Sequence, residues 1–67
     1  MTKRVVTQGG GDNLFKIVGS KTLEVYQIKV GAFTDRTSKI GSARNLEDAL
    51  SIIKSYSGNQ IKEIRDL

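Results

Sequence analysis

The feature that most constrains the fold is one segment with helical spacing and readable ends, residues 45–58. Its apolar side chains recur at the i, i+3, i+4 and i+7 positions of one helix face: Leu46, Ala49, Leu50 and Ile53. Asn45 is a favourable N-cap ahead of this face, and Gly58 is a natural stop behind it. The pattern therefore predicts one amphipathic helix over about residues 46–56.

Three short runs precede the helix, and each is rich in β-branched or aromatic residues. They are LFKIV at 14–18, LEVYQIKV at 23–30 and RTSKIGSA at 36–43. The middle run alternates polar and apolar residues most clearly, and turn-forming residues separate the three. This order is typical of an antiparallel meander.

The C-terminal segment, residues 59–67, leaves two alternatives open. Ile61, Ile64 and Leu67 are spaced by three, which suits a helical turn, whereas a strand beside the sheet would bury Ile64. We favour the strand. The expected fold is therefore α+β, a small antiparallel sheet of three to four strands with one helix packed on one face, in the order β-β-β-α-β.

The N-terminal residues 1–13 contain three consecutive glycines, Gly9 to Gly11, followed by turn formers. We expect them to form a flexible tail, with residues 14–67 as a single α+β domain. Val5 and Val6 could instead add a short edge strand.

Several kinds of chemistry are excluded by what the 67 residues lack. There is no cysteine and no histidine, so thiolate and imidazole metal sites and His-based acid–base catalysis have no residues to use. The carboxylates are scattered, and the GSKT segment at 19–22 lacks the glycines of a phosphate-binding loop. We therefore expect no enzyme activity, no cofactor and no metal. No apolar run approaches the length of a membrane span, so we expect no membrane partner and a cytoplasmic location.

Strand alternation divides the expected sheet into two faces. We expect the helix to cover the side with the more uniform apolar set, namely Phe15, Ile17, Tyr26, Ile28, Val30 and Ile40. The open face would then carry no acidic residue. Its candidate binding residues, with the neighbouring Arg36 included, are Lys16, Gln27, Lys29, Arg36, Thr37 and Lys39.

This open face suggests two functions. The first is a small non-enzymatic protein-interaction or self-associating accessory domain, because Leu14, Val18, Leu23 and Val25 would lie among the lysines and a homodimer or an unknown protein partner would cover them. The alternative is a nucleic-acid-binding module, because the net charge is +4 and the lysines would share one face. A three-stranded sheet backed by one helix resembles the DNA-binding layout of some phage-type integrase N-termini and plant AP2 domains. That resemblance is one of layout, and no motif carries over residue by residue.

Overall fold

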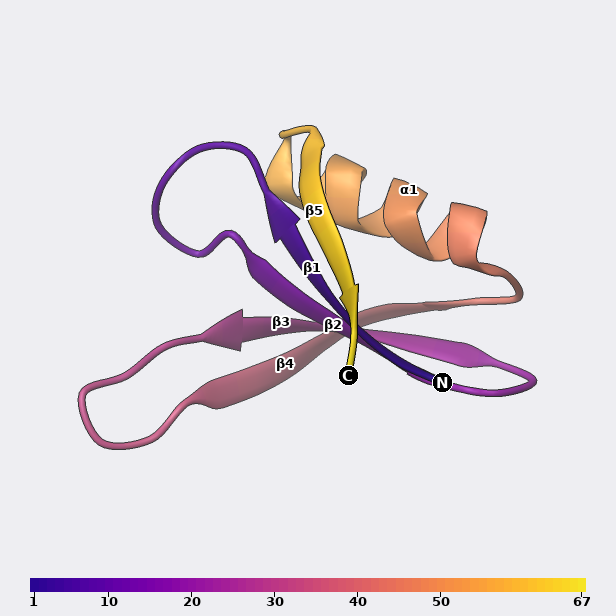
Figure 1. Ribbon diagram of the computed structural model, residues 1–67, viewed down its shortest axis with the longest axis horizontal. Helices are drawn as coiled ribbons and strands as arrows, with labels where there is room; N and C mark the ends of the chain where they lie inside the picture. The colour runs from indigo at the N-terminus through magenta and orange to yellow at the C-terminus, as the bar shows by residue number, and fades with distance from the viewer.

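The chain folds into one five-stranded antiparallel sheet with a single helix on one face (Figure 1). The computed structural model describes all 67 residues. Its elements are β1 (Thr2–Thr7), β2 (Leu14–Gly19), β3 (Leu23–Lys29), β4 (Arg36–Ala43), α1 (Leu46–Ser57) and β5 (Ile61–Asp66). The expected α+β class is confirmed, with one strand more than the largest sheet predicted.

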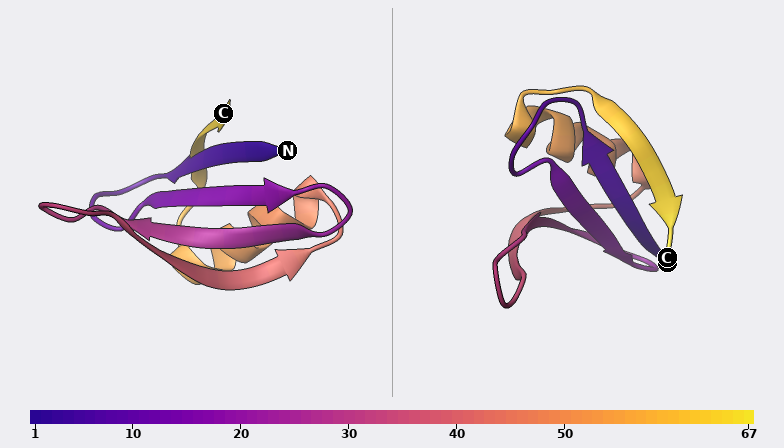
Figure 2. Two further views of the ribbon diagram at one scale, coloured as in Figure 1. Left: turned by 90° about the horizontal axis from the view of Figure 1, so that it is seen from below. Right: turned by 60° about the vertical axis from the view of Figure 1, so that its left-hand side comes forward.

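The strand order across the sheet is β4-β3-β2-β1-β5, and every neighbouring pair is antiparallel. The first four strands follow one another as a meander. The chain then forms α1 and returns as β5 at the far edge, beside β1, so that the strongly twisted sheet curls around the helix (Figure 2). The strand expected near the C-terminus is thereby confirmed.

The ends of α1 are set by the local signals in its sequence. The Asn45 side chain accepts a hydrogen bond from the backbone amide of Asp48 at 2.8 Å, which satisfies one free donor of the first turn. Gly58 has a φ of 72°, and its amide donates to the carbonyl of Lys54 at 2.8 Å. With 12 residues, α1 falls short of the length and apolar character needed to cross a bilayer.

The core lies between α1 and the concave side of the sheet. Phe15, Ile17 and Val25 are fully buried from the sheet, and Ala49 and Ile53 are fully buried from the helix. The helix lies close over β4, because a Cβ added at Gly41 would stand only 3.2 Å from Cγ2 of Ile52.

The expected flexible tail is wrong for residues 2–7, which form β1 between β2 and β5. Val5 and Thr7 are completely buried under the helix side of the sheet. The edge-strand alternative also underestimated this segment, because β1 has a partner on both sides. Residues 2–7 are therefore part of the sheet.

The faces of β3 are the reverse of those expected from its composition. Leu23 and Val25 are buried on the helix side, whereas Tyr26 and Ile28 lie on the opposite side. The reason is the length of the β2–β3 connection: Gly19 pairs with Leu23, which leaves a loop of three residues. The strand runs expected at 14–18 and 23–30 leave a turn of four residues, 19–22, which shifts the register by one residue and exchanges the two faces.

Candidate functional site

A row of cationic side chains crosses the face of the sheet that α1 leaves uncovered, here called the open face. In the strand register, Lys39 of β4 lies opposite Tyr26 of β3, and Tyr26 lies opposite Lys16 of β2. Arg4 of β1 follows, with Arg65 of β5 beyond it. This cationic row (Lys39, Tyr26, Lys16, Arg4 and Arg65) spans four strand spacings, about 19 Å.

At one end of the cationic row, the Glu24 carboxylate binds the side chains of Lys39 and Tyr26. The ammonium of Lys39 donates to Oε1 of Glu24 at 3.0 Å, and the hydroxyl of Tyr26 donates to Oε2 at 3.1 Å. Glu24 and Tyr26 are two residues apart on β3 and therefore project from the same face. The carboxylate holds both side chains in place and neutralises the charge of Lys39.

These contacts shift the pKa values of all three groups. The hydrogen bonds from Lys39 and Tyr26 hold the pKa of the Glu24 carboxyl below its usual range, and the charge of Lys39 adds to this effect. The carboxylate in turn raises the pKa of the Lys39 ammonium and of the Tyr26 phenol. At neutral pH the cluster is therefore a charged Glu24–Lys39 pair beside a neutral phenol.

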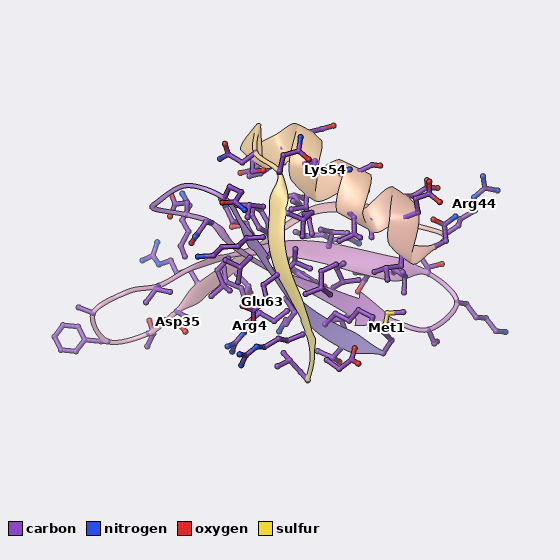
Figure 3. All side chains as sticks on the ribbon, turned by 45° about the horizontal axis from the view of Figure 1, so that its top comes forward. Met1, Arg4, Asp35, Arg44, Lys54 and Glu63 are labelled. Carbon is purple, nitrogen blue, oxygen red and sulfur yellow. The ribbon has the colours of Figure 1, made fainter.

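The other end of the cationic row also carries an ion pair, between Arg65 and Glu63 of β5. Arg4 and Lys16, at the centre, make no salt bridge. Figure 3 labels Arg4 of β1 and Glu63 of β5, which the strand register places on the open face. The expectation that the open face has no acidic residue was wrong, because Glu24 and Glu63 both lie on it. The centre of the cationic row nevertheless keeps two cations, Arg4 and Lys16, that have no acidic partner.

A second row runs beside the first and is mostly aliphatic. Ile28 of β3 lies opposite Leu14 of β2, which lies opposite Val6 of β1. All three are half-buried. This aliphatic row (Ile28, Leu14 and Val6) and the cationic row together make a surface with a charged edge and an apolar edge.

The structure places three of the six candidate residues on the open face and three elsewhere. Lys16, Thr37 and Lys39 lie on it, as expected. Gln27 is on the helix side and is only 6% exposed; its amide donates to the carbonyl of Asp12, and its oxygen accepts from the Tyr56 hydroxyl. Lys29 and Arg36 lie opposite each other on that same side and are exposed.

Sequence reasoning missed Tyr26, Arg4 and Arg65. Tyr26 was assigned to the core by the one-residue register error, and Arg4 was assigned to the tail. Arg65 could have been found by alternation, because the strand expected at the C-terminus would bury Ile64 and would therefore turn Arg65 to the opposite face. Phe33 is 99% exposed in the β3–β4 loop.

Two hollows flank the glycine-containing loop before β2, each with a volume of about 320 Å³. One lies against Leu14 and Ile28, and the other is lined mainly by polar groups that include Gln27 and Tyr56. Asp12 borders both and is their only carboxylate. No cluster of three His, Cys, Asp or Glu side chains lies close enough together to hold a metal ion.

Comparison with protein-family models, with curated proteins and with solved structures finds no match for this chain.

Proposed function

We propose that this domain binds single-stranded nucleic acid across its open face. The observation that carries the proposal is the cationic row, which crosses all five strands and has Tyr26 within it and the aliphatic row beside it. Phosphate groups would contact the central cations, Arg4 and Lys16. Bases would stack on Tyr26 or lie against the aliphatic side chains. We place this activity in the cytoplasm, where such ligands are accessible.

A single strand fits this surface better than a duplex does. The faces of paired bases are stacked inside a duplex, so an aromatic ring and aliphatic side chains on an open sheet cannot reach them. A single strand presents phosphates along one edge and base faces along the other, which is the arrangement of the two rows.

The test is fluorescence anisotropy with labelled single-stranded RNA and DNA of mixed sequence, and with a duplex, at about 50 mM salt. We expect binding to both single strands and weaker binding to the duplex. For two to four phosphate contacts, the logarithm of the affinity should fall with the logarithm of salt concentration with a slope of about −1.4 to −2.8. If no oligonucleotide binds at tens of micromolar protein, the proposal is wrong.

Two matched charge reversals distinguish binding by the open face from attraction by the overall charge of the protein. Lys16→Glu reverses a charge at the centre of the cationic row, whereas Lys29→Glu makes the same change on the helix side of the sheet. We expect the first variant to weaken binding by about tenfold or more and the second by about two- to threefold. Equal losses would contradict a role for the open face.

A protein-interaction domain is the second candidate, because the half-buried aliphatic row offers apolar surface to a partner. Substitution of Leu14 by Ser separates the two candidates. A protein partner anchored on the aliphatic row would be lost, whereas the salt-dependent part of oligonucleotide binding would remain.

A further inference from the structure

We propose that two copies of this chain pair through their β5 strands, edge to edge and antiparallel, to form one continuous sheet. β5 is the outermost strand of the sheet beyond β1. Its residues 62–66 are all exposed, so nothing covers this edge (Figure 1). An uncovered strand edge is a template for another strand. The inference does not depend on nucleic-acid binding by the open face.

The hydrogen bonds between β1 and β5 determine which backbone groups of β5 point outward. The amide of Leu67 donates to the carbonyl of Thr2 at 3.0 Å, so this opposed pair is a hydrogen-bonded one. Hydrogen-bonded and non-bonded pairs alternate along an antiparallel ladder. Arg65 and Glu63 therefore bond inward to β1, and the groups of Asp66 and Ile64 point toward the free edge. The regular alternation ends at Glu63, because the register shifts between Val6 and Thr7 and leaves Lys62 without a partner in β1.

This alternation restricts the ways in which two β5 strands can pair around a two-fold axis. Outward-pointing residues must face outward-pointing residues, so the axis can pass through residue 63, 64 or 65. An axis at Glu63 would oppose two glutamates, and an axis at Arg65 would oppose two arginines. Like charges directly opposite each other are destabilising. Only the axis at Ile64 avoids both conflicts.

With the axis at Ile64, the pairs in the regular part of the ladder are complementary. Ile64 faces the partner's Ile64, and Glu63 faces the partner's Arg65. Two copies therefore contribute two opposed charge pairs, and Lys62 and Asp66, at the two ends of the paired segment, also carry opposite charges. Ile64 is 40% exposed in the single chain and would be covered at the axis.

The other free edge, that of β4, does not offer this complementarity. The charged residues of β4, Arg36 and Lys39, are both positive, so two β4 strands would repel each other. Each outer ladder has one register shift, between Val25 and Tyr26 for β3–β4 and between Val6 and Thr7 for β1–β5, so irregularity does not distinguish the two edges. The distribution of charge does distinguish them, and the β5 edge is the one suited to a second copy.

The pairing would also place both open faces on one side of the dimer. A two-fold axis perpendicular to the sheet keeps the same face of each copy in the same direction. The cationic rows of the two chains would then continue across a ten-stranded sheet.

The test is sedimentation equilibrium over a wide concentration range, without nucleic acid. We expect a monomer–dimer equilibrium for the natural chain. Glu63→Arg places two arginines opposite two arginines, and Arg65→Glu places glutamates opposite glutamates. Each variant alone should raise the dimer dissociation constant by about tenfold or more, while circular dichroism shows that each still folds.

An equimolar mixture of the two variants should restore the dimer, because each arginine of one chain then faces a glutamate of the other. In amide exchange of the natural chain, the Ile64 and Asp66 amides should gain protection as the protein concentration rises. The Glu63 and Arg65 amides should already be protected at low concentration. The proposal is overturned by a monomer at all concentrations up to about 1 mM, by growth into larger polymers, or by a mixture that behaves like its separate variants.

Discussion

Glu24 limits the positive charge of the open face because it holds Lys39 in an ion pair. Replacing it with glutamine would remove one negative charge and free the ammonium for a phosphate. We therefore expect Glu24→Gln to tighten binding of single-stranded oligonucleotides by about two- to fivefold at low salt. Anisotropy titration measures this change. Glu47→Gln, an equal charge change on the exposed side of α1, is the control and should have a smaller effect.

The Glu24 carboxyl should also have a pKa below that of an ordinary glutamate. Because the pKa of Glu24 is lower in the folded chain than in the unfolded chain, its contacts add stability above the unfolded-state pKa, and this contribution is lost as the pH falls through the folded-state pKa. The side-chain carboxyl carbon, followed by NMR from about pH 2 to pH 7, should titrate below the usual glutamate midpoint. In the Lys39→Gln variant the midpoint should rise. An unchanged midpoint would mean that the pair does not form in solution.

Gly19 is the residue on which the β2–β3 connection depends. Its φ is +144°, and a Cβ there would lie 2.1 Å from the carbonyl oxygen of Thr22. We expect Gly19→Ala to lower the free energy of unfolding by about 2 kcal/mol or more, as measured by urea denaturation. Gly10→Ala, where an added Cβ meets nothing within 4 Å, should change it by less than about 1 kcal/mol. Equal effects would show that the turn tolerates rearrangement.

At the scale of the elements, the helix N-terminus gives a direct prediction. Asn45→Ala removes the acceptor that binds the amide of Asp48 and should lower the free energy of unfolding by about 1 kcal/mol. Asn45→Asp keeps an acceptor and should retain most of the stability. Urea denaturation of the three proteins provides the measurement. A loss as large in Asn45→Asp as in Asn45→Ala would contradict the capping role.

The elements also show which parts of the fold could be predicted from sequence. α1 could be, because its caps and its apolar spacing are local signals. The strands β2, β3 and β4 could be found as well, and the faces of Lys16 in β2 and of Thr37 and Lys39 in β4 were predicted correctly. The direction in which the side chains of β3 point could not be predicted. That direction depends on whether Gly19 belongs to the turn or to the strand, and a single residue of difference exchanged Tyr26 with Val25. Gln27 and Lys29 were misplaced for this reason. Arg36, beside the β3–β4 loop, was also expected near the open face and lies on the helix side.

At the scale of the whole molecule, β1 is the element that sequence alone did not identify. Its residues, TKRVVT, are followed by three glycines, and its two partners β2 and β5 come from opposite ends of the chain. No local pattern reports such long-range pairing. The three- to four-stranded prediction kept this segment only as an alternative edge strand, and Arg4 at the centre of the cationic row was therefore assigned to the tail.

The position of β1 can be tested by a pair of substitutions at adjacent residues. Val5→Asp places a carboxylate at a completely buried site and should lower the free energy of unfolding by about 3 kcal/mol or more. Val6→Asp makes the same change on the open face, where the side chain is half-buried, and should lower it by about 1 kcal/mol. Chemical denaturation measures both. If both substitutions lower the free energy of unfolding by similar small amounts, residues 2–7 behave as a flexible tail.

The pairing of β1 with β5 has a further consequence for the order in which the chain folds. Lys3 and Asp66, which form a salt bridge across this pair, are 63 positions apart. Closing so long a loop costs about 2 kcal/mol more in chain entropy than closing a hairpin of a few residues. The β2–β3–β4 meander and α1 can therefore assemble before β5 docks. Since the edge offered to a second copy exists only after this last step, dimerisation through β5 would be restricted to chains that have already folded.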